Sequence, residues 1–84
     1  MTITPYDVLK ANTNSPEWVA WRAERDTKAW PTDPEERKVR MRMRIKATES
    51  DLRAMEAAPS TPAIRTAIKR LRADVETSKR WLEE

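Results

Sequence analysis

The residues of this chain best suited to chemistry are the cations of one short segment, Arg37 to Lys46, which reads RKVRMRMRIK. It holds six positive charges and no negative one. Guanidinium groups form bidentate contacts with phosphate and carboxylate, so the segment could contact a nucleic acid or an acidic protein surface. Its apolar and basic residues also alternate, which is typical of a half-buried β-strand. The surrounding elements must decide which interpretation holds.

The composition argues against catalysis. The chain has 84 residues and contains no Cys, His or Gly. Zinc fingers, imidazole bases, catalytic triads, disulfides and glycine-rich phosphate loops are therefore excluded. Its two adjacent carboxylate pairs stand at a predicted helix start and at the chain end: Glu35 with Glu36, and Glu83 with Glu84. Neither position suits acid–base work, so we expect no enzyme, no cofactor and no metal site.

Prolines predict where the helices begin and end. Four of the six follow a Thr, Ser or Asp, which can cap a helix that starts with proline. Two others, Pro31 and Pro59, interrupt helical patterns, because a residue before proline is pushed out of the helical region. The sequence therefore predicts one domain over residues 1–84, with helices near 5–11, 16–29, 34–57 and 62–83.

The last two predicted helices carry heptad patterns. Apolar or small residues recur at spacings of four and three at Met41, Ile45, Thr48, Leu52 and Met55, and again at Ile64, Ile68, Leu71, Val75, Ser78 and Leu82. If the chain folds back between them, the facing positions always add up to 119 or 120. We predict an all-α fold in which short N-terminal helices pack on a long, antiparallel, coiled-coil-like two-helix hairpin. The alternating segment is then helical.

As a helix, the basic segment has two apolar stripes. Met41 and Ile45 join the hairpin seam, whereas Val39 and Met43 face the other side. We expect the second stripe to be covered by the helix near 16–29, with its tryptophans and Trp30. A homodimer packed through that stripe is the competing cover.

The cations of the segment have a structural role available to them. In the hairpin register, positive and negative residues of the two helices face one another, and such flanks fix pairing in coiled coils. The predicted pairs are Arg44 with Glu76, Arg37 with Glu83, Glu49 with Arg70, Asp51 with Lys69, and Glu56 with Arg65. The open end of the hairpin nevertheless keeps an excess of positive charge.

That open end is the predicted binding site. Its cations can contact a partner and its tryptophans can anchor one, because Trp and Arg dominate binding hot spots. The predicted partner-binding residues are Arg37, Arg40, Arg44, Arg80, Trp30 and Trp81. The preferred function is a small adaptor or inhibitor that docks on a partner protein. Its size and style are those of phage and mobile-element regulators, which is an analogy and not a property of its residues.

Two alternatives use the same basic end. One is nucleic-acid binding, for which a net charge of +3 is mild. The other is a homodimer or higher oligomer whose subunit interfaces form basic pockets for a small phosphorylated ligand. No apolar run approaches the roughly 20 residues of a membrane span, and no signal peptide is visible. We therefore expect no membrane partner and a cytoplasmic location.

Overall fold

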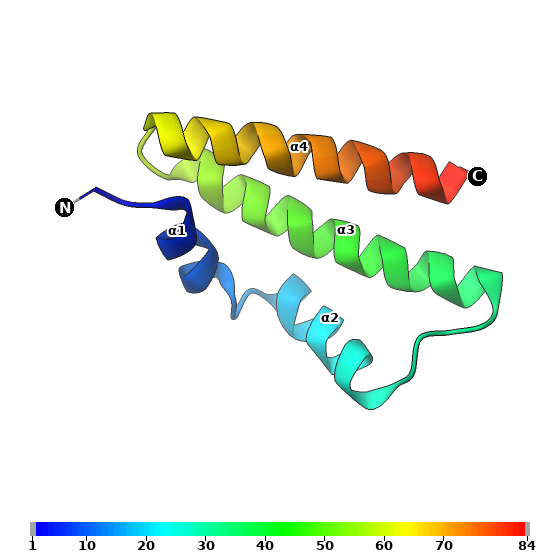
Figure 1. Cartoon of the computed structure of the whole chain (residues 1–84). Coiled ribbons are helices and arrows are strands. Elements are labelled where there is room, and N and C mark those ends of the chain that lie inside the picture. Colours follow the sequence, from blue (N-terminus) through cyan, green and yellow to red (C-terminus); the bar gives the residue numbers. More distant parts are fainter. Residues whose placement is uncertain (1, 84) are drawn as a thin grey trace.

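The computed structural model describes residues 2–83, and in that range the regular secondary structure is entirely helical (Figure 1). The elements are α1 (Pro5–Asn12), α2 (Pro16–Thr27), α3 (Pro34–Ala57) and α4 (Pro62–Glu83). The prediction of an all-α fold is confirmed. The predicted bounds of the two long helices coincide with α3 and α4. The second helix ends two residues earlier than expected, at Thr27.

Side-chain caps explain three of the four helix starts. At α1, the hydroxyl of Thr4 accepts a hydrogen bond from the amide of Asp7, and the Asp7 carboxylate accepts one from the Thr4 amide in return. These bonds from Thr4 lower the pKa of the Asp7 carboxyl. The side chain of Asp33 caps α3, and that of Thr61 accepts a bond from Ile64 at the start of α4. The sequence thus fixes each of these starts locally.

The hairpin forms as predicted. α4 runs back along the whole of α3 (Figure 1), and the seam between them holds most of the buried apolar residues. Met55 and Ile64 are each 1% exposed, and Ile45 and Val75 are also buried. These residues belong to the two heptad patterns, so the packing of the hairpin follows directly from their spacing.

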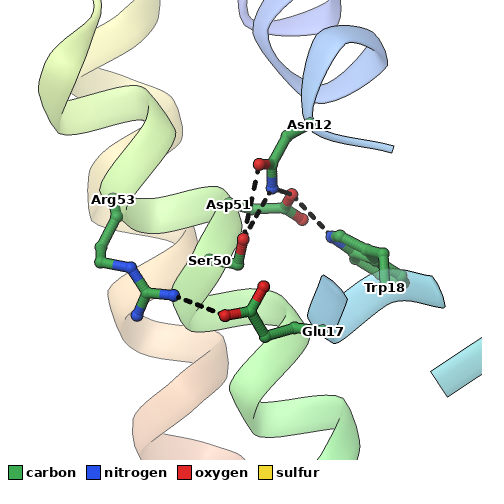
Figure 2. A network of polar contacts seen from close by, with 6 residues as sticks. All are labelled: Asn12, Glu17, Trp18, Ser50, Asp51 and Arg53. Carbon is green, nitrogen blue, oxygen red and sulfur yellow. Dashed lines mark hydrogen bonds and ion pairs between the residues drawn. The ribbon is translucent and has the colours of Figure 1, made fainter. Parts of the chain in front are cut away.

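A polar network fastens the N-terminal helices to the other side of α3 (Figure 2). The Asp51 carboxylate accepts hydrogen bonds from the Asn12 amide at 2.7 Å and from the Trp18 indole at 2.8 Å. The Asn12 amide also donates to the hydroxyl of Ser50 at 3.1 Å. Asp51 and Ser50 are buried, so these bonds replace the water that folding removes. One helix of the hairpin therefore positions both short helices.

The predicted ion pairs along the hairpin are wrong. Among residues 2–83, none of the five expected pairs forms, and the ion pair between α3 and α4 joins Arg72 to Glu56 at 3.5 Å. Asp51 is buried on the opposite side of α3, where it bonds to α1 and α2. Long exposed side chains gain little from a fixed pairing, so complementary charge along a helix does not by itself produce contacts.

The four helices form a single layer (Figure 1). α3 lies in the middle, α4 packs along one side of it, and α1 and α2 pack along the other. The Cα positions span 46 × 26 × 14 Å, and the radius of gyration is 14.1 Å. A compact domain of this length has a radius of gyration of about 12 Å. Both broad faces of the layer are therefore open to the surroundings.

The solvent-accessible surface area is also larger than is usual for a chain of this mass. The solvent-accessible surface is 6074 Å² for a chain of 9.8 kDa. A typical folded monomer of that mass exposes roughly 5,200 Å², so this fold exposes about 900 Å² more. The excess follows from the lack of a second layer.

Candidate functional site

The linker between α2 and α3 is held in place by two arginines. It covers residues 28–33 and has no helix of its own, so its carbonyl groups lack helical partners. Arg37 donates from its Nε to the carbonyl of Pro31 at 2.7 Å. Arg40 donates from Nη2 to the carbonyl of Ala29 at 3.2 Å. Two successive turns of α3 therefore fix the chain on both sides of Trp30.

The ring of Trp30 is supported by Arg40 and is exposed to solvent. The guanidinium carbon of Arg40 lies 5.7 Å from the centre of the Trp30 ring, within the range of a cation–π contact. Arg40 is only 6% exposed, whereas Trp30 is 51% exposed. We call Trp30, Arg37 and Arg40 the Trp30 platform. It presents half of an indole to the surroundings on a buried, hydrogen-bonded support.

A hollow of about 340 Å³ lies beside the platform, between α2 and α3. Val39, which was expected to be covered by α2, stands 54% exposed in this hollow. Its remaining lining is of mixed charge and consists of Glu24, Lys28, Pro31, Glu36, Arg40 and Met43. The expected cover is therefore wrong at this end, because α2 stops at Thr27. Farther along the same side of α3, Ala47 is fully buried.

The predicted site residues divide into three groups. Trp30, Arg37 and Arg40 come together in the platform. Arg37 also lines a second hollow, of about 200 Å³, with Trp81, Pro34 and Lys38. Arg44 and Arg80 are exposed, and the side chains of both lack hydrogen bonds and ion pairs within residues 2–83. Buried Arg40 supports the linker and is not itself an exposed contact.

One surface feature has no counterpart in the sequence prediction. A groove of about 590 Å³, here called the α1–α4 groove, is lined by Pro5, Leu9, Met55, Pro62, Ala63, Thr66, Ala67, Arg70 and Leu71. It depends on how α1 packs against the end of the hairpin, and no periodic pattern fixes that. The small residues Ala63 and Ala67, outside the heptad seam, are the signal that could have indicated it.

The fold and these open anchors define an all-α helical-hairpin protein. Comparison with protein-family models, with curated proteins and with solved structures gives no match to this chain. Within the described residues, no helix is both long and apolar enough to cross a membrane. Function must therefore be inferred from the surfaces themselves.

Proposed function

We propose that this chain is a small non-catalytic docking protein of the cytoplasm, which binds a partner protein through the Trp30 platform as an adaptor or inhibitor. The observation that carries the proposal is that Trp30 is 51% exposed while its linker is held by hydrogen bonds from Arg37 and Arg40. A side chain held in its bound position before binding loses little entropy when the partner arrives. Tryptophan is also the residue most enriched in binding hot spots.

The surroundings of Trp30 suit a protein surface. Val39 adds a second exposed apolar group, and the hollow beside it can receive a side chain of the partner. The rim of this hollow carries both signs of charge, from Lys28, Glu24 and Glu36. An apolar centre with a polar rim is the usual anatomy of a protein interface.

The test captures the partner at this site and then removes the anchor. A photo-crosslinking residue placed at Val39 is expected to capture the partner from extracts of the host, whereas the same residue at the exposed Glu76 on α4 is not. With the purified partner, Trp30→Ala should weaken binding by about 30-fold or more, as hot-spot residues do. Val19→Ala is the matched control, since Val19 is an exposed apolar residue on α2. Equal affinity of the Trp30→Ala variant would refute the proposal.

Nucleic-acid binding is the second candidate. Arg42, Arg44 and Lys46 are exposed on α3, and within residues 2–83 they form no ion pair. Binding through phosphates should weaken steeply between about 50 and 200 mM salt. It should persist in the Trp30→Ala variant and fall when these three cations are replaced. A protein that shifts neither DNA nor RNA at low salt would exclude this candidate.

A further inference from the structure

We propose that a second copy of this chain binds to α4, so that Trp81 of each copy fills the α1–α4 groove of the other. In the single chain, the groove is unfilled and Trp81 is exposed to solvent. The groove holds about 590 Å³ of free space, and Trp81 is 40% exposed. This surface shares only Arg37 with the Trp30 platform, because Arg37 also lines the hollow at Trp81. The proposal does not depend on binding at Trp30.

The two features lie on the same broad face of the layer. Ala63 in the groove and Trp81 are eighteen residues apart on α4, which is about five complete turns. Met55, also in the groove, and Arg37, which lines the same hollow as Trp81, have the same separation on α3. Both helices therefore turn the groove and the hollow at Trp81 toward one side. A flat partner can contact both at once.

The residues on this side of α4 form a self-complementary series. Small Ala63 and large Trp81 lie nine residues on either side of Arg72. Cationic Arg70 lies two residues before Arg72, and anionic Asp74 lies two residues after it. Ala67 and Thr77 likewise lie five residues before and five residues after Arg72. If two copies of α4 pack antiparallel about this position, each small residue meets a larger one. Each Arg70 then meets the Asp74 of the second copy.

Such an arrangement is an isologous interface with two-fold symmetry, in which one patch serves both copies. Arg70 and Asp74 are exposed, and within residues 2–83 neither forms an ion pair. They are therefore available for two symmetric pairs across the interface. Charge complementarity here fixes the antiparallel register, since a parallel pairing would place like charges together.

The exposed area matches what a dimer requires. The fold exposes about 900 Å² more than a typical monomer of its mass. A standard protein interface buries about 800 Å² on each partner. A second copy packed on the face that carries α4 and the α1–α4 groove would add a second layer of helices, and most domains have at least two layers.

Charge reversal tests the register directly. The wild-type protein should sediment with twice the 9.8 kDa mass of the chain. Arg70→Asp and Asp74→Arg should each weaken dimerisation by about tenfold or more, because each places like charges opposite one another. The double variant should restore the dimer. Lys79→Asp is the matched control, since Lys79 stands two residues before Trp81 and faces the opposite side of α4.

The contribution of Trp81 is tested separately. Trp81→Ala should also weaken the dimer by about tenfold or more, whereas Trp30→Ala should leave it unchanged. Helical circular dichroism of each variant verifies that it is folded. A wild-type monomer at the highest soluble concentration would overturn the proposal, and so would a double variant that stays monomeric while its helices are intact. Neither result would bear on binding at Trp30.

Discussion

The indole nitrogen of Trp18 lies 2.8 Å from the carboxylate of Asp51, a residue that is 5% exposed in the C-terminal half of α3. The same carboxylate oxygen accepts a hydrogen bond from Asn12 at 2.7 Å. Asp51 therefore joins three helices: α1 through Asn12, α2 through Trp18, and its own α3 (Figure 2). Hydrogen bonds to a charged acceptor are the stronger kind, and here they hold the N-terminal half to the hairpin.

Replacing Asp51 should loosen the N-terminal half selectively. Asp51→Ala leaves the half-buried Trp18 indole without its acceptor and the Asn12 amide with only Ser50, and is expected to lower the free energy of unfolding by about 3 kcal/mol. Hydrogen exchange should show that amides of α1 and α2 lose protection while the centre of the hairpin keeps most of its own. Trp18→Phe, which removes one donor, should cost about 1 kcal/mol. A uniform loss of protection along the chain would contradict this division.

The hairpin could be predicted from the sequence because two heptad patterns match in one register, and the helix starts because proline follows a capping residue. The position of Asp51 could not. Its charge fits an ion pair with Lys69 as well as it fits a buried network. Which of these two environments Asp51 occupies depends on where α1 and α2 pack. α1 has only eight residues, too few for its spacing to define a face. Val39 was mispredicted because the exact end of α2 decides its cover.

The seam of the hairpin should be sensitive to lost volume at Ile64. This residue is 1% exposed and lies near the loop, where α3 and α4 meet. Ile64→Val is expected to lower the free energy of unfolding by about 1 kcal/mol, and Ile64→Ala by about 2–5 kcal/mol. Urea denaturation followed by helical circular dichroism measures both. The exposed neighbour Arg65, replaced by Ala, should change stability by less than about 0.5 kcal/mol.

Arg40 should control the order of the linker more than the stability of the helices. Arg40→Ala removes the hydrogen bond to Ala29 and the support beneath the Trp30 ring. NMR relaxation should then show faster motion of residues 29–32, while α3 and α4 keep their helical signals. Arg40→Lys keeps the charge but not the planar fork, and should restore little of the order. Arg42→Ala, on the exposed side of α3, should leave the linker unchanged.

The start of α1 should be sensitive to acid. Hydrogen bonds from the backbone and the hydroxyl of Thr4 lower the pKa of Asp7 from its ordinary value of 3.8. Asp7 therefore stabilises the fold above pH 3.8, and this contribution is lost as the pH falls through its lower pKa in the folded protein. NMR titration of the Asp7 carboxyl should give a midpoint below 3.8. Thr4→Ala should raise it partly, because the backbone bond remains.

The central place of α3 also sets an order of events during synthesis. α1 and α2 pack on α3 and not on each other. They leave the ribosome first, and no surface exists for them until the third helix has followed. The third helix in turn lacks its seam until α4 is made. Trp18 and its neighbours therefore stay uncovered while most of the chain is being translated, and the nascent protein must reach its final form late rather than piece by piece.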